Sequence, residues 1–182
     1  MSLPRFLVHP AALALFACGA FTVASCSAPV PPPFQGALSA TLGNATGQNC
    51  PAPGPLTVGA VNATDRVPVS DGDNGASVSC KVVAAAGGFV AEGTLSAGDT
   101  NFSMTNVAIQ GDTGTGTVRL GGASTAGIYA SEGPCTFTLI QPADAGRIWT
   151  KFSCPTLKSA SALNAECSVV DGIVIFENCL TQ

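Results

Sequence analysis

The chain has 182 residues, of which 46% are apolar and only 10% are charged, and its formal net charge is −4. Soluble domains usually carry about 25% charged residues, and this sequence has no Lys/Arg cluster of the kind that binds nucleic acid or anionic lipid. Gly, Ala, Ser, Thr and Val dominate, a composition that favours strands joined by turns over long surface helices.

The first 25 residues have the features of an export signal. Arg5 supplies one positive charge, and an apolar run covers residues 11–23. A membrane-spanning helix needs roughly 20 apolar residues, whereas the apolar part of a secretory signal needs roughly 7–15. We therefore expect residues 1–25 to be a cleaved signal peptide rather than a membrane span.

A cysteine, Cys26, follows the apolar run directly after Val23, Ala24 and Ser25. A branched apolar residue, two small residues and a cysteine resemble the lipobox of bacterial lipoproteins. The resemblance implies that Cys26 carries acyl chains, palmitate among them, and anchors the protein in the bacterial cell envelope, because more than one chain gives a stable anchor. Ser27, where retained lipoproteins have Asp, implies the outer membrane if the source is Gram-negative.

Two alternatives to lipidation at Cys26 stay open. Cys18 ends a similar tetrapeptide, but Phe16 is bulky where a lipobox has a small residue. An ordinary signal peptide cleaved near Ala24 would leave Cys26 in the mature chain as one more thiol.

Residues 26–34 are rich in proline and precede the part of the chain that can fold. Pro29, Pro31, Pro32 and Pro33 favour an extended polyproline segment of about 3.1 Å per residue. We expect a lipid-anchored linker over residues 26–34 and a single β-rich globular domain over residues 35–182, which is long enough to bury a core.

Strand candidates and turns alternate at short spacing through this domain. The predicted strands cover residues 37–42, 56–62, 77–84, 88–95, 101–109, 115–120, 125–130, 135–140, 147–153, 166–170 and 173–178. Turn residues such as Gly, Asp, Asn and Pro separate them. This pattern predicts an all-β fold, an antiparallel β-sandwich or jelly-roll-like domain. Residues 156–166 are the one helix-like stretch, either a short helix or a crossover loop.

Cysteine parity supports both export and the lipid anchor. Cys18 leaves with the signal, and acylation of Cys26 leaves an even number, which in an exported chain predicts three disulfides. The six are Cys50, Cys80, Cys135, Cys154, Cys167 and Cys179. Metal binding is not expected, because His9 is the only histidine and lies inside the signal, and no Cys-x₂-Cys pair occurs.

The pairing best supported by geometry is Cys135–Cys154. The predicted strands 135–140 and 147–153 flank a Pro/Gly turn, and a hairpin there places the two cysteines opposite each other at its open end. The other two pairs are weaker. Asp171-Gly172 is a strong hairpin signal, but a hairpin there leaves Cys167–Cys179 out of register, and Cys50–Cys80 follows only by elimination.

The residue types that are missing limit the possible chemistry. A mature chain without histidine excludes a Ser-His-Asp or Cys-His site, and oxidised cysteines cannot serve as nucleophiles. A carboxylate pair of the glycosidase kind survives as an alternative, although nothing in the sequence brings two carboxylates together. Its candidates are Glu92, Glu132, Glu166 and Glu177.

Two further stretches are weak candidates for binding. Asp71 and Asp73 lie in a Gly-rich segment that partly resembles a calcium loop, but Gly75 and Val82 stand where that loop has oxygen ligands, so a solvated turn is the preferred explanation. Trp149 alternates with Arg147 and Lys151, so it faces outward if its neighbours face the core. There it could stack on a sugar or anchor a protein, or a second layer could cover it.

The sequence therefore predicts an exported lipoprotein whose globular part is not an enzyme and needs no cofactor. We expect a binding or structural module that meets a protein or a carbohydrate. A carrier of an apolar ligand in a cavity between sheets is the first alternative, because the chain is so apolar. A carboxylate-based hydrolase is the second.

Overall fold

β-Strands are the main regular element of the structure, a computed structural model that describes residues 29–182 except 123–124, 126 and 162–164. Within these residues, Pro32–Gln182 forms one unit. The strands are β1 (Gln35–Asn44), β2 (Gly54–Val58), β3 (Ala60–Val61), β4 (Arg66–Val67), β5 (Val69–Ser70), β6 (Ser77–Ala85), β7 (Gly88–Ala97), β8 (Thr100–Gln110), β9 (Thr113–Gly122), β10 (Gly127–Ser131), β11 (Cys135–Leu139), β12 (Ile148–Ser159) and β13 (Glu166–Glu177). A 3₁₀ turn, η1 (Asp73–Gly75), precedes β6.

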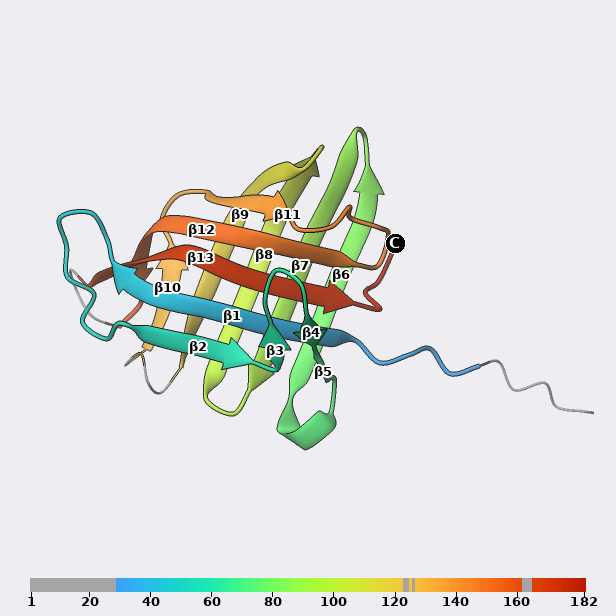
Figure 1. Ribbon diagram of the computed structural model, residues 1–182, viewed down its shortest axis with the longest axis horizontal. Helices are drawn as coiled ribbons and strands as arrows, with labels where there is room; N and C mark the ends of the chain where they lie inside the picture. The colour runs from blue at the N-terminus through green and yellow to red at the C-terminus, as the bar shows by residue number, and fades with distance from the viewer. Residues whose placement is uncertain (1–28, 123–124, 126, 162–164) are drawn as a thin grey trace, which may run out of the picture. The chain divides into compact units, whose positions relative to one another are not determined.

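The main sheet is antiparallel and folds over into two layers, which confirms the predicted all-β, sandwich-like class. Its strand order is β2-β1-β13-β12-β10-β9-β8-β7-β6, and β11 pairs with both β12 and β9. In Figure 1, β2, β1, β13 and β12 run across the molecule in front of β6, β7, β8 and β9. We call these the front layer and the back layer; β10 and β11 join them at one side.

The opposite side is closed by the C-terminal segment and β5. Leu180 bridges to Lys81 of β6, with hydrogen bonds of 3.0 Å from the Leu180 N–H to the Cys80 carbonyl and 2.8 Å from the Val82 N–H to the Leu180 carbonyl. The short β5 pairs with the start of β1. The front and back layers are therefore tied together along both margins.

Aromatic rings fill the centre between the layers. Phe102 of the back layer lies 5.5 Å from the ring of Phe152 and 6.4 Å from that of Phe176, both in the front layer. Two glycines make room for them. A Cβ on Gly93 would lie 2.6 Å from the Phe176 ring, and one on Gly172 would lie 2.3 Å from the Phe152 ring.

The structure shows three disulfides. Cys135 is joined to Cys154 across β11 and β12, as the hairpin prediction expected. The other two pairings predicted from the sequence are wrong, because the structure joins Cys50 to Cys167 and Cys80 to Cys179.

A Cys167–Cys179 pairing needs the chain to turn back between the two cysteines, and the Cys50–Cys80 pairing, reached by elimination, fails with it. Asp171-Gly172 does not form a hairpin; it lies in a register shift within one continuous strand, β13, which pairs with β1 and β12 on its two sides. A glycine is required at position 172 because any side chain there would overlap the Phe152 ring, and not because the chain turns. A strand of this length extends roughly 40 Å, so Cys167 and Cys179 lie at opposite ends and cannot be joined.

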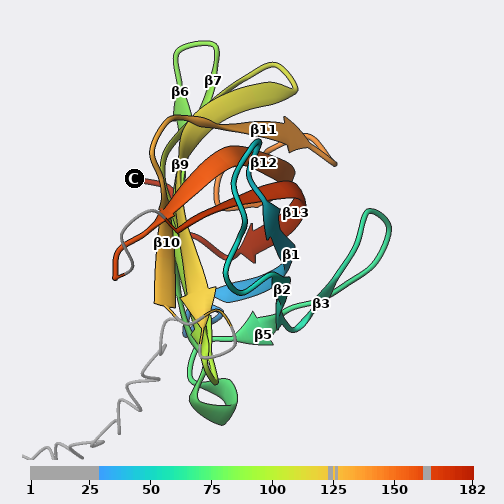
Figure 2. The ribbon, with the colours of Figure 1, turned by 90° about the vertical axis from the view of Figure 1, so that its left-hand side faces the viewer.

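The short helix that the sequence allowed over residues 156–166 is not present in the described part of that stretch. β12 continues to Ser159 and β13 begins at Glu166. The predicted strand 56–62 is also interrupted, and its last residues belong to a separate two-stranded hairpin, β3-β4. This hairpin stands on the outer side of the front layer, away from the back layer (Figure 2).

Candidate functional site

A groove of about 290 Å³ lies on the back layer, where β7, β8, β9 and β10 run side by side. Its lining residues are Thr94, Leu95, Ser96, Asn101, Phe102, Ser103, Arg119, Leu120 and Ile128. Strand alternation buries three of these, Leu95, Phe102 and Leu120, on the core side. The remaining lining residues are those that the strands present to solvent.

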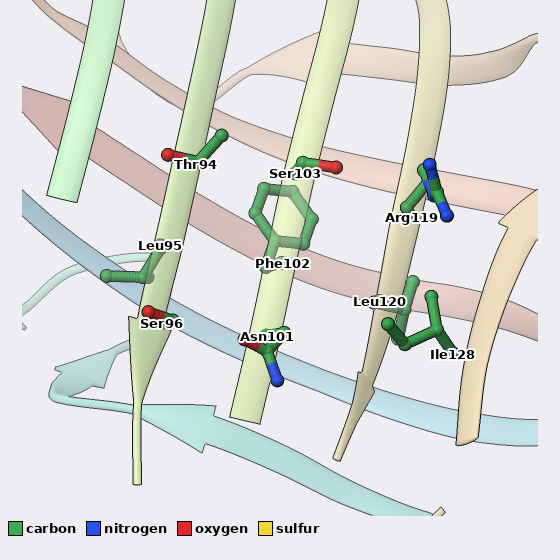
Figure 3. Close-up of a pocket in the computed structure, with 9 residues that line it drawn as sticks. All are labelled: Thr94, Leu95, Ser96, Asn101, Phe102, Ser103, Arg119, Leu120 and Ile128. Carbon is green, nitrogen blue, oxygen red and sulfur yellow. The ribbon is translucent and has the colours of Figure 1, made fainter. Parts of the chain in front are cut away.

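Strand register arranges the outward side chains in two rows. Thr94, Ser103 and Arg119 are opposite one another on β7, β8 and β9. Ser96 and Asn101 are opposite one another in the next row, and Figure 3 shows both rows on neighbouring strands. The groove therefore carries hydroxyl, amide and guanidinium groups from three hairpin-connected strands.

Ile128 forms the apolar side of the groove. It lies opposite Gly121, and a Cβ on Gly121 would be 2.2 Å from the Gly127 carbonyl oxygen and 2.8 Å from the Cα of Ile128. The absence of a side chain at Gly121 lets β10 approach this closely. Ile128 remains 41% exposed beside the polar rows.

The polar groups of the groove are largely free to bind a ligand. Among the described residues, the side chains of Ser96, Asn101, Ser103 and Arg119 form no hydrogen bond or ion pair with the protein. Thr94 differs, because its hydroxyl lies 2.7 Å from that of Ser79. Arg119 is the only charged residue among the described residues that line the groove, so its positive charge is uncompensated there.

A second hollow of about 240 Å³ lies between β6, β7 and the C-terminal segment. Its two charged residues, Lys81 and Glu92, are directly opposite each other on β6 and β7. The Cys80–Cys179 disulfide also lies there. This hollow is electrically balanced and belongs to the closure of the fold, which makes the Arg119 groove the better candidate site.

Trp149, a candidate for an exposed binding residue, is instead 2% exposed. It does face outward from the front layer, but the β3-β4 hairpin covers it: Val61 packs in the same cluster, and the Arg66 guanidinium lies 5.0 Å from the centre of its ring. Arg66 also pairs with Glu177 at 3.2 Å. The indole N–H is buried and has no hydrogen-bond partner among the described residues.

In the turn before β6, the Asp71 side chain and the Asp73 backbone take part in hydrogen bonds. The Asp71 carboxylate accepts a 2.8 Å hydrogen bond from the Val78 N–H, and the Asp73 carbonyl accepts one of 2.8 Å from Ala76. Within the described ranges, no three His, Cys, Asp or Glu side chains gather closely enough to hold a metal ion. The segment is a 3₁₀ turn whose Asp71 side chain is bonded to the start of β6.

Two of the four candidate carboxylates meet at one lysine. The Lys158 ammonium lies 2.7 Å from Glu132 and 3.7 Å from Glu166. The hydrogen bond to Glu132, with the added attraction of both carboxylates, raises the pKa of Lys158. Because the lysine occupies the space between these carboxylates, they form a surface ion-pair network rather than an open acid–base pair. Glu92 and Glu177 lie elsewhere, opposite Lys81 and beside Arg66.

The remaining predicted site residue, Cys26, lies outside the described residues, as do the signal peptide and Ser27. The three disulfides are typical of a protein that folds in an oxidising, extracellular type of environment. In the part of the chain with described structure, no helix has the length and apolar character to cross a membrane.

Comparison with protein-family models, with curated proteins and with solved structures finds no significant match to this chain. Sequence reasoning did not find the groove. The signal that could have found it is the polar residue at every second position of three successive strands, Ser96, Asn101, Ser103 and Arg119 among them.

Proposed function

We propose that this protein is an exported bacterial lipoprotein, anchored through acylated Cys26, whose β-domain is a non-catalytic binding module. The module presents the Arg119 groove to a polar ligand. The observation that carries the proposal is the set of unpartnered polar side chains, Ser96, Asn101, Ser103 and Arg119, that line one groove beside Ile128. Binding sites commonly combine a few converging polar groups with an apolar wall in this way.

The cysteines support the exported, anchored part of the proposal. All six cysteines from Cys50 to Cys179 are paired in disulfides. Cys26 is therefore the one cysteine after the predicted signal that has no partner available within the domain. Acylation gives it a role that agrees with the lipobox-like sequence before it.

Core packing favours a binding module over a carrier. A carrier of an apolar ligand needs space between the layers, but the rings of Phe102, Phe152 and Phe176 occupy the centre of the domain. Gly93 and Gly172 bring the strands so close to these rings that no Cβ would fit. A ligand is better received on the outer surface, where the groove lies.

Intact-mass spectrometry of the mature protein from its native host tests the anchor. We expect a mass that begins at Cys26 with acyl chains attached, and no free thiol after alkylation without reduction. A mature chain with an unmodified, alkylatable Cys26 would overturn the lipoprotein part of the proposal.

An array of immobilised oligosaccharides and peptides, probed with the mature protein in detergent, tests the groove. Binding should be lost in the double variant Asn101→Ala/Ser103→Ala. It should persist in Thr115→Ala/Thr136→Ala, which removes two exposed hydroxyls from paired positions on β9 and β11 outside the groove. Equal binding by both variants, or no binding by the wild type, would contradict the module.

A further inference from the structure

We propose that the Arg119 groove binds an acidic saccharide and that the Arg119 guanidinium receives the sugar carboxylate. This inference rests on the proposed function and names the chemical class of its ligand. It starts from charge. Beyond the predicted signal the chain has six bases against eleven acids, yet the one charged residue in the groove is a cation without an ion-pair partner among the described residues.

A carboxylate suits this site better than a phosphate. The planar guanidinium can donate two parallel hydrogen bonds to one carboxylate group. A phosphate monoester carries about −1.5 to −2 charge at neutral pH and would find a single cation among the lining residues. One uncompensated positive charge therefore matches a monoanionic group.

The rest of the groove suits the body of a sugar. Ser103 lies opposite Arg119, and Asn101 and Ser96 form the adjacent row, so donors and acceptors extend from the guanidinium along the strands. A hydroxyl both donates and accepts, as does the Asn amide, which matches the hydroxyl groups of a saccharide. Ile128, on the other side, offers an apolar surface to the C–H face of the ring.

The groove lacks the feature on which neutral sugars commonly rely. Its one aromatic ring, Phe102, is 3% exposed and belongs to the core. The chain's single Trp is buried under the β3-β4 hairpin. Without an exposed ring on which a sugar could stack, the charged contact at Arg119 has to supply much of the affinity and the selectivity.

Isothermal titration of the mature, full-length protein in detergent with a monoanionic sugar trimer, two galactose units and one terminal galacturonic acid, tests the inference. We expect binding that weakens with added salt, because the pair is solvent-exposed. Arg119→Gln should lower the affinity by about tenfold or more, and Arg119→Lys should lower it less, since it keeps the charge but loses the two-point contact. Lys151→Gln is the matched control, because it removes an exposed cation from the front layer, and it should bind as the wild type does.

Two further titrants distinguish the chemistry from the proposed function. The methyl ester of the same trimer, which lacks the negative charge, should bind at least tenfold more weakly. If the ester binds equally well and the Asn101→Ala/Ser103→Ala variant abolishes its binding, the acidic class is wrong while the binding module stands. Inorganic phosphate that binds more tightly than the trimer would also overturn the carboxylate assignment. No binding of the trimer at millimolar concentration would do the same.

Discussion

The outer faces of the two layers differ in what covers them. On the front layer, Trp149 and Ile175 point outward but are almost fully buried, because the β3-β4 hairpin packs on them. On the back layer, the outward side chains of β7, β8 and β9 are mostly polar, and the groove beside Arg119 is open.

This difference follows from the residue pattern along the strands. In β12, Ile148, Trp149 and Thr150 are buried in succession, so this strand needs cover on both faces, as continuous apolar runs do. In β8, buried and exposed residues alternate, so one face remains in contact with water. A covered face contributes to stability, whereas an open polar face is available for a ligand.

The largest expected effect is the loss of the covered tryptophan. Trp149→Ala should lower the free energy of unfolding by about 3–5 kcal/mol, because it removes a buried ring and leaves a cavity beneath the hairpin. Arg119→Gln, on the open face, should change it by less than about 0.5 kcal/mol. Urea unfolding of both variants measures the contrast. Similar losses in the two would show that the faces do not differ in this way.

Next comes the glycine beneath the core ring. Gly172→Ala should lower the unfolding free energy by about 1–3 kcal/mol, because the new methyl group would overlap the Phe152 ring. Gly133→Ala is the control, since a Cβ there meets nothing within 4 Å. If the two substitutions lower the unfolding temperature equally, the overlap with the Phe152 ring does not explain the effect at Gly172.

A smaller effect is expected at the hairpin that covers Trp149. Arg66→Ala removes both the guanidinium over the ring and the ion pair with Glu177, together about 0.5–1 kcal/mol at such partly exposed positions. Tryptophan fluorescence should shift to the red and acrylamide quenching should increase. Lys158→Ala, which breaks a different surface ion pair, should leave the fluorescence spectrum unchanged. An identical red shift in Lys158→Ala would show that the shift does not come from uncovering Trp149.

The smallest effect is the pH dependence of the Lys158 network. The folded-state pKa of Lys158 is raised above its ordinary value of 10.5, chiefly by the hydrogen bond to Glu132. The stabilisation is therefore complete below the unfolded-state pKa and is lost as pH rises through the folded-state pKa. The stability difference between wild type and Lys158→Met should shrink from pH 9 to pH 11.5. Tyr129, whose pKa burial raises, titrates in both proteins and cancels.

Local signals sufficed where the chain pairs with its immediate neighbour. The hairpin of β11 and β12 and its Cys135–Cys154 bridge were predicted because a Pro/Gly turn joins two alternating strands. The same reasoning failed at Asp171-Gly172. This turn-like dipeptide lies inside β13, a strand that pairs with β1 on one side and β12 on the other. A glycine required by a distant aromatic ring cannot be distinguished from a turn glycine by its neighbours in sequence.

The candidate site shows the same division. The alternation of buried and exposed residues along β8 and β9 predicts that Ser103 and Arg119 face the solvent. Their position opposite each other depends on the strand register and on a bulge in β8. The burial of Trp149 could not be read from β12, because its cover comes from Val61 and Arg66, far away in the chain.

By itself, the sequence determined the all-β class, the number of cysteines available for pairing and the expectation of export, because each depends on composition, parity or short-range pattern. Tertiary structure decided which cysteines pair, which outward face is covered and where the groove opens. Those outcomes depend on contacts between residues about 100 positions apart, such as Cys80 and Cys179. Such contacts exist only in the packed structure, where both layers share one core.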